Sequence, residues 1–429
     1  MLRLNRHHWV FEYSQKWKPV LRKVVPISLL RKVKKITIQK SMKELDQNPR
    51  VPYEQGKFPD GINFIGPIQA ESGLGQSCRL IVHQIDMSGI PCAVTDFDLE
   101  GKVSNSNREY ADRIENRHPY GVNVIDINPY ELGLAYMKYG RELWDHRYNI
   151  AYWSWEMEQF PEEWLECEKL IDEIWTPSEF TSNCFRKRFH VPVHTVPYYM
   201  EVPVNENGSR PYFHLPEDQF LFLVMFDSAR TTSRKNPMGA LRAFEQAFPA
   251  DHQKVGLVIK VNNPKEEDLR KIRDTVGEDR NIYLIAEVME KSTINSLIQC
   301  VDVFVSLHRA EGFGLVIAEA MLLGTPVIAT NYSANTEFMS EESSCLVDYQ
   351  LCKVEKDDEI YKKGYVWAEP DVAQAAQYMR RLFEDHQYYE RKKKIGRKQI
   401  LETLDVDGTV EPIRKRYRIV TEKNTETYE

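Results

Sequence analysis

Long apolar runs, closely paired cysteines and internal repeats are all missing from this sequence of 429 residues. Without an early apolar run of sufficient length, neither a signal peptide nor a membrane-spanning helix is predicted. The seven cysteines are odd in number and lack CxxC or metal-ligand spacing, which argues against a disulfide framework and a metal site: Cys78, Cys92, Cys167, Cys184, Cys300, Cys345 and Cys352. We therefore expect a cytoplasmic protein with reduced thiols.

An overall excess of basic residues is also missing, since the formal net charge is −7. Such a chain is not expected to bind nucleic acid. Residues 1–57 depart from this balance as a basic appendage, in which Trp9 and Trp17 accompany many lysines and arginines. This composition is typical of a helix on an anionic membrane surface. It equally fits a helix packed on the next domain with a solvated basic face, and the sequence leaves both interpretations open.

The remaining chain has the composition of a globular α/β protein, with 42% hydrophobic and 28% charged residues, and its length fits two domains. Short apolar, β-branched runs alternate with helical patterns, which predicts parallel sheets. The proline-bearing stretch 201–216 is the expected linker. Strands are expected at 62–65, 91–96, 121–127, 148–153, 171–177 and 193–197 before it, and at 220–226, 255–261, 282–285, 301–307 and 326–330 after it. Helices are expected at 77–88 and, opening over 366–371, at 366–385.

The clearest chemical signal lies between the last two of these strands. A helix is predicted over 315–323, stopped by Gly324, and two glycines precede it in the run Glu311-Gly312-Phe313-Gly314. Free backbone N–H groups at such a helix start bind phosphate. Glu311 before the helix and Glu319 one turn inside it are placed to reach hydroxyls of the same ligand. The alternative is that Glu311 only complements the helix dipole and Glu319 is solvated.

This segment, EGFGLVIAEAM, resembles the Glu-x7-Glu signature of the retaining family 4 glycosyltransferases. The resemblance implies the GT-B fold, in which two Rossmann-like, doubly wound α/β domains face a central cleft. It also implies that Glu311 contacts the donor sugar, that the amides of Gly312, Phe313, Gly314 and Leu315 hold the diphosphate, and that Glu319 binds the ribose. The expected domains are 58–205 for the acceptor and 215–395 for the nucleotide sugar, with terminal helices over 396–429 returning to the first domain.

A cationic loop follows the first strand of the second domain. Lys235 resembles the family lysine that contacts the donor β-phosphate. The Gly-Arg pair usual before that lysine is missing, so Arg230 or Arg234 is expected to supply the second positive charge. The alternative is a solvated basic loop.

Two motifs of the first domain carry weaker signals. In SGLGQSCR, which resembles a glycine-rich loop of one family branch, the Gly73 and Leu74 amides are assigned to the donor phosphate or the acceptor side. Asp96 and Asp98 match the Asp-x-Asp metal motif of another glycosyltransferase fold, but two acids at a strand end are better read as incidental. We therefore expect no metal and no cofactor.

The segment YWSWEMEQFPEEW resembles the same branch. Aromatic residues beside a carboxylate suit a sugar acceptor, whose ring faces stack on aromatics, although Trp153 and Trp155 could equally be core residues. Asn128 stands where many members of the family carry a histidine.

The resemblance implies a retaining, metal-independent glycosyltransferase. Its partners would be a nucleotide-diphosphate sugar and a glycan or lipid-linked acceptor of cell-surface polysaccharide synthesis, at the inner face of the membrane. A dinucleotide-dependent oxidoreductase is a rival, but Gly73 and Gly75 lack the third glycine of its fingerprint. A non-catalytic partner subunit is a second rival, and it would be expected to have lost Glu311, Lys235 or the glycine loop.

Overall fold

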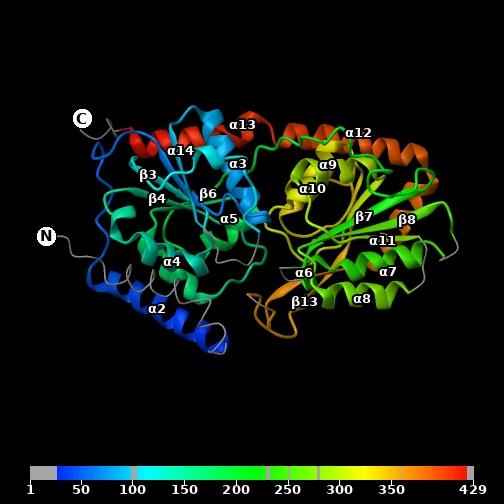
Figure 1. Cartoon of the computed structure of the whole chain (residues 1–429), viewed down its shortest axis with the longest axis horizontal. Coiled ribbons are helices and arrows are strands. Elements are labelled where there is room, and N and C mark those ends of the chain that lie inside the picture. Colours follow the sequence, from blue (N-terminus) through cyan, green and yellow to red (C-terminus); the bar gives the residue numbers. More distant parts are fainter. Residues whose placement is uncertain are drawn as a thin grey trace.

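The computed structural model describes residues 27–97, 104–228, 232–249, 252–277, 281–358 and 360–422. It consists of two α/β domains side by side, each built on one parallel sheet, with the terminal helices running across both (Figure 1). This arrangement confirms the predicted fold class of two Rossmann-like domains.

The first sheet has six parallel strands in the order β2-β1-β3-β4-β5-β6. The strand order turns back at β1, as in doubly wound domains, because β2 pairs on one side of β1 and β3 on the other. The strands are β1 (Ile62–Gly66), β2 (Cys92–Asp96), β3 (Val122–Ile125), β4 (Tyr148–Tyr152), β5 (Glu173–Thr176) and β6 (Val193–Thr195).

The second sheet also has six parallel strands, in the order β12-β11-β10-β7-β8-β9. Its strands are β7 (Phe220–Asp227), β8 (Val255–Asn262), β9 (Ile282–Ile285), β10 (Val303–Ser306), β11 (Val327–Thr330) and β12 (Cys345–Val347). A separate antiparallel hairpin, β13 (Tyr349–Lys353) with β14 (Val366–Pro370), follows β12.

Helices cover the sheets of both domains (Figure 1). The first domain contains α2 (Ile27–Gln47), α3 (Gly73–Ser88), η1 (Ala111–Arg113), α4 (Pro129–Tyr139), η2 (Arg141–Leu143), η3 (Glu162–Leu170) and α5 (Glu179–Arg186). The second contains α6 (Thr232–Lys235), α7 (Pro237–Ala247), α8 (Glu266–Val276), α9 (Lys291–Cys300), α10 (Leu315–Leu323), η4 (Ala334–Glu337), α11 (Val372–Glu384) and α12 (His386–Thr403).

The chain then crosses back to the first domain through α13 (Val406–Thr409) and α14 (Glu411–Thr421), and α14 packs beside α3. Arg414 donates hydrogen bonds to the carbonyls of Met87 and Ser88 at the end of α3. Arg416 forms a bidentate pair with the fully buried Glu173 of β5. The C-terminal helix is therefore held on the first domain by charge-assisted hydrogen bonds as well as by apolar packing.

The described part of the N-terminal appendage packs on the first domain. Met42 and Leu45 of α2 are buried against it, and a Cβ on Gly133 of α4 would lie 2.5 Å from Ile38. Leu29 and Ile36 are instead 51% and 63% exposed. The end of α2 therefore behaves as an ordinary packed helix, while residues 1–26, with Trp9 and Trp17, lie outside the described residues. Within the described chain, no helix combines the length and the apolar character that crossing a membrane requires.

Two expected boundaries were wrong for identifiable reasons. The helix after β1 was expected to begin at residue 77. Ser72 instead caps α3 by accepting a hydrogen bond from the Gly75 amide, so this helix starts at Gly73. A helix was also expected to open at 366–371, but 366–370 pair with 349–353 as a hairpin. The side chain of Asp371 caps α11 from the next position.

Candidate functional site

The segment between β10 and α10 has the predicted form. Gly314 is the N-cap of α10 in a left-handed conformation, with φ 97°, and no side chain caps the helix start. Glycine adopts this conformation without steric cost. The first turn of α10 therefore presents backbone N–H groups that no side chain of the helix start satisfies.

Two cations converge on Glu311, the residue that opens this segment. Its Oε1 lies 2.5 Å from Nζ of Lys235, and its Oε2 lies 3.1 Å from Nη1 of Arg234. Burial alone would raise the pKa of Glu311, but Lys235 and Arg234 outweigh it and hold the pKa at about 2. Glu311 is therefore ionised, and the alternative of a simple helix-dipole partner does not describe its contacts.

Arg234 makes contacts that the sequence did not predict. Its Nη1 donates a 2.7 Å hydrogen bond to the carbonyl of Ala310, and its Nη2 lies 3.5 Å from Glu156 of the first domain. Burial would lower the pKa of Arg234, but Tyr361, Glu311 and Glu156 raise it above its ordinary value. The guanidinium therefore links the segment after β4 of the first domain to the loop before α10 of the second, and in this structure it contacts protein groups.

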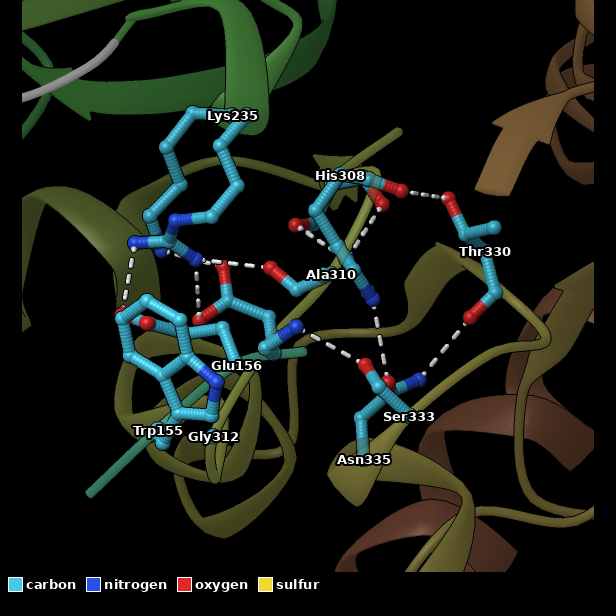
Figure 2. Close-up of polar contacts among 12 residues, drawn as sticks. Trp155, Glu156, Lys235, His308, Ala310, Gly312, Thr330, Ser333 and Asn335 are labelled. Atoms are coloured by element: carbon cyan, nitrogen blue, oxygen red, sulfur yellow. Dashed lines mark hydrogen bonds and ion pairs between the residues drawn. The ribbon is translucent and has the colours of Figure 1, made fainter. Parts of the chain in front are cut away.

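A buried polar frame consists of His308, Thr330, Ser333 and Asn335, which Figure 2 labels, and it contacts the backbone of Glu311 through Ser333. The Glu311 amide donates to Oγ of Ser333 at 2.8 Å, and Ser333 has the unusual φ of 73°. A ring nitrogen of His308 lies 3.0 Å from Oδ1 of Asn335, whose Nδ2 donates to the carbonyl of Thr330. Burial lowers the pKa of His308, so this residue is a neutral member of the frame.

Glu319 lies inside α10 and is 1% exposed, so its interpretation as a solvated residue is wrong. Its Oε2 lies 2.5 Å from Nζ of Lys291 at the start of α9. The carboxylate predicted to bind a ribose is therefore already paired with a partly exposed cation of the same domain.

The glycine segment also contacts the first domain. A Cβ on Gly312 would lie 2.4 Å from Oγ of Ser154 and 3.0 Å from the carbonyl of Trp155, so no larger residue fits there without movement. The hydroxyls of Ser178 and Thr181 donate to the Gly312 carbonyl at 2.7 and 3.2 Å. The two domains therefore meet directly at the glycine segment.

The other predicted site residues have no described hydrogen bond to this centre. Gly73 and Leu74 form the first turn of α3, and no described hydrogen bond joins them to Glu311 or Lys235. Arg230 and Asp98 lie outside the described residues, and Asp96 accepts a hydrogen bond from the Gln69 amide. No group of side chains suited to a metal ion occurs in the described part of the chain.

The tryptophans of the acceptor segment are core residues. Trp153 is fully buried and donates to the Ile127 carbonyl, and Trp155 is 1% exposed and donates to the Gln159 carbonyl. Neither presents a ring face for a sugar to stack on. Of the two interpretations of these residues, the core one is correct.

The hairpin that contacts α6 and the site was not predicted from the sequence. Arg309 forms a bidentate pair with Glu369 of β14 and donates to the Ser233 carbonyl at 2.5 Å. The Ser233 hydroxyl donates to Asp358 in the hairpin loop. These bonds attach the hairpin to α6, which carries Arg234 and Lys235. The alternating Val366-Trp367-Ala368 run was the available signal for a strand.

The comparisons with known proteins agree with this architecture. The chain matches the Anabaena protein HepE in complex with UDP and glucose at 13% identity and a TM-score of 0.58, over 83% of this chain and 99% of that chain. It matches a sucrose-phosphate synthase from Thermosynechococcus elongatus at 14% identity and a TM-score of 0.61, over 84% and 99%. These likenesses show the fold, which is the GT-B fold of glycosyltransferases.

A third match is a mutant of S. aureus TarM in complex with Fondaparinux, alpha-GlcNAc-glycerol and UDP, at 12% identity and a TM-score of 0.51. It covers 69% of this chain and 55% of TarM, so the chain spans little more than half of that protein. No curated protein matches significantly in sequence. Residues 213–399 match the family model described as Glycosyl transferases group 1, so the second half of the chain carries a domain of that family.

Proposed function

We propose that the protein is a retaining glycosyltransferase that moves a sugar from a nucleoside-diphosphate sugar to a hydroxyl of a glycan or lipid-linked acceptor. The observation that carries this proposal is the convergence of Lys235 and Arg234 on Glu311, directly before the uncapped start of α10. A diphosphate at that helix start would meet backbone N–H groups and the Lys235 ammonium together. The group 1 domain over 213–399 supports the same assignment.

The proposed chemistry rests on stabilising the charge of the leaving diphosphate. Lys235 is 29% exposed at its side chain, so it can turn from Glu311 toward a phosphate. Its attraction grows as the bond between the anomeric carbon and the phosphate oxygen breaks and the electron pair leaves with the diphosphate. Glu311 orients the sugar, and Glu319 together with Lys291 binds the ribose. The acceptor attacks on the same face and gives its proton to the departing phosphate.

The test is donor turnover without any acceptor other than water. The protein is titrated calorimetrically with UDP, GDP, ADP and dTDP, and the matching nucleotide sugars are then followed for slow release of nucleoside diphosphate. We expect one nucleotide to bind and its sugar to be hydrolysed, with turnover surviving EDTA. Binding without any hydrolysis would favour the non-catalytic partner subunit, and turnover that requires magnesium would contradict the metal-independent mechanism.

We also propose that α2 contacts an anionic membrane surface, as suits a lipid-linked acceptor in polysaccharide synthesis. Leu29 and Ile36 are exposed, and the exposed Lys40 and Lys43 follow on the same helix. Because Met42 and Leu45 are buried, substitution tests this better than deletion. Leu29→Ser with Ile36→Ser should release the protein from phosphatidylserine vesicles and leave nucleotide binding intact. Wild-type protein that ignores such vesicles at low salt would refute the membrane contact.

A further inference from the structure

Glu156 brings a carboxylate of the first domain to the centre built by the second. It follows β4 at the carboxyl edge of the first sheet, and its Oε1 lies 3.5 Å from Nη2 of Arg234. Arg234 in turn contacts Glu311. Figure 2 shows Glu156 with Trp155 and Lys235 around this centre. Arg234 thus stands between Glu156 of the first domain and Glu311, the carboxylate that is proposed to orient the donor sugar.

The two carboxylates differ in how they are held. The Glu311 side chain is 7% exposed and both of its oxygens are paired with cations, whereas the Glu156 side chain is 21% exposed. The distance from Glu156 to Arg234 exceeds that of a hydrogen bond. A carboxylate has about four lone-pair sites, so Glu156 keeps capacity to accept a hydrogen bond from a bound hydroxyl.

Tyr361, from the loop of the β13–β14 hairpin, packs against the segment that carries Glu156. Its ring stacks on Trp155 with centroids 5.5 Å apart and an interplanar angle of 30°. Burial raises the pKa of Tyr361 well above its ordinary value, and the nearby Glu156 carboxylate raises it further. The same loop is tied to α6 through Asp358 and Ser233. The hairpin therefore contacts both the first-domain segment that carries Glu156 and α6, which carries Arg234 and Lys235.

We propose that Glu156 is the residue that accepts the hydrogen bond of the acceptor hydroxyl, and that Tyr361 is a positioning residue for it. This inference rests on the proposed function. The ligand is a neutral sugar or polyol hydroxyl, because Arg234 already faces both carboxylates and Lys235 is assigned to the diphosphate, so neither cation is left for an anionic acceptor. In the transfer, the anomeric carbon loses its bond to the phosphate oxygen and gains one to the acceptor oxygen. The acceptor proton passes to the leaving diphosphate, so Glu156 only aligns the hydroxyl and takes no proton in the step.

The experiment compares transfer with hydrolysis in the full-length protein. The nucleotide sugar that the protein hydrolyses is supplied with glycerol or p-nitrophenyl hexosides as neutral acceptor probes, and chromatography separates the glycosylated probe from free sugar. The variants are Glu156→Gln, Tyr361→Phe, which keeps the ring on Trp155, and Glu158→Gln as control. Glu158 is an exposed carboxylate two residues along the same segment.

Losing one charge-assisted hydrogen bond should lower kcat/KM for the acceptor probe by about tenfold or more in Glu156→Gln. Donor hydrolysis and the Kd for nucleoside diphosphate should stay within about twofold, since water needs no alignment by Glu156 and the donor is held by the other domain. Tyr361→Phe should show a smaller loss of the same kind, and Glu158→Gln none.

Other results would overturn the inference. Equal losses of transfer and hydrolysis in Glu156→Gln would make Glu156 a structural partner of Arg234, and unchanged transfer would remove it from the acceptor side. Wild-type protein that hydrolyses donor yet glycosylates none of the probes would also count against a neutral hydroxyl site. Absence of hydrolysis with every nucleotide sugar would instead defeat the proposed function itself.

Discussion

The hydroxyl of Ser178, on the first domain, donates a 2.7 Å hydrogen bond to the backbone carbonyl of Gly312, on the second. Both residues are buried, and Ser178 also caps α5 by accepting from the Thr181 amide. One side chain therefore starts a helix of one domain and anchors the glycine segment of the other. This hydrogen bond and the close approach of Ser154 to Gly312 show how tightly the two domains meet there.

Replacing Ser178 by glycine separates these two roles. Glycine costs only a few tenths of a kcal/mol at an N-cap, whereas a lost buried hydrogen bond costs about 1 kcal/mol or more. Ser178→Gly should therefore lower the free energy of unfolding by about 1 kcal/mol in urea denaturation and weaken nucleoside diphosphate binding. If Ser178→Gly has the same free energy of unfolding as wild type while Ser178→Ala has a lower one, only the N-cap contributes to stability and the hydrogen bond to Gly312 does not.

Asp126 gives the stability a pH dependence. Its carboxyl, behind β3, is fully buried and accepts a 2.7 Å hydrogen bond from Ser77, and burial raises its pKa to about 7. A carboxyl whose pKa is raised by folding contributes stability below its unfolded pKa near 4, and that contribution is lost as the pH rises through 7. We expect Asp126→Asn, which resembles the protonated form, to match wild type near pH 4.5.

Above pH 7.5, Asp126→Asn should have a higher free energy of unfolding than wild type, by up to roughly 4 kcal/mol. The reason is that folding raises the pKa of Asp126 from near 4 to about 7. Urea denaturation of both proteins across this range provides the measurement, with Asp112→Asn as a control on an exposed carboxylate. A constant difference between wild type and Asp126→Asn at all pH values would show that the carboxyl does not titrate in this window.

The pair of Lys291 and Glu319 should respond unequally to its two possible disruptions. Lys291→Met leaves the buried Glu319 carboxylate without its cation, at a cost of roughly 2 to 3 kcal/mol, because the partly exposed lysine gives a weaker pair than a fully buried one. Glu319→Gln leaves a lysine that can reach water, so its cost should be about 1 kcal/mol. Chemical denaturation decides between them, and an equal or greater loss in Glu319→Gln would contradict the described geometry.

Much of the fold was predictable from local pattern. Buried parallel strands such as β7 and β10 are continuous apolar runs, and Gly324 ends α10 in the left-handed conformation that glycine favours. The hairpin was not predictable in the same way, since four of the five residues of its strand β13 are exposed, and its strands pair only across the long loop 354–365. The position of its loop against Trp155 depends on tertiary packing alone.

In the candidate site, too, the features set by local sequence were predictable and those set by tertiary packing were not. The placement of Glu311, Glu319 and Lys235 followed from a strand, a glycine-rich turn and a helix start, all of which are local. The partners of these residues did not follow, because Lys291, Glu156 and Tyr361 reach the centre from other elements or from the other domain. Arg234 was expected to face a phosphate, and its actual contacts depend on how the two domains meet.

The most direct test of the proposed chemistry is the turnover of Lys235→Ala with saturating nucleotide sugar, compared with Lys265→Ala, which removes an exposed lysine of the same domain. We predict that Lys235→Ala lowers kcat by roughly 10² to 10³ with little change in donor KM, because the lysine charge counts most as the diphosphate leaves. Lys265→Ala should match wild type, and Glu319→Ala should mainly raise donor KM. A Lys235→Ala variant that folds normally and keeps full kcat would contradict the proposed role of the Lys235 and Glu311 pair.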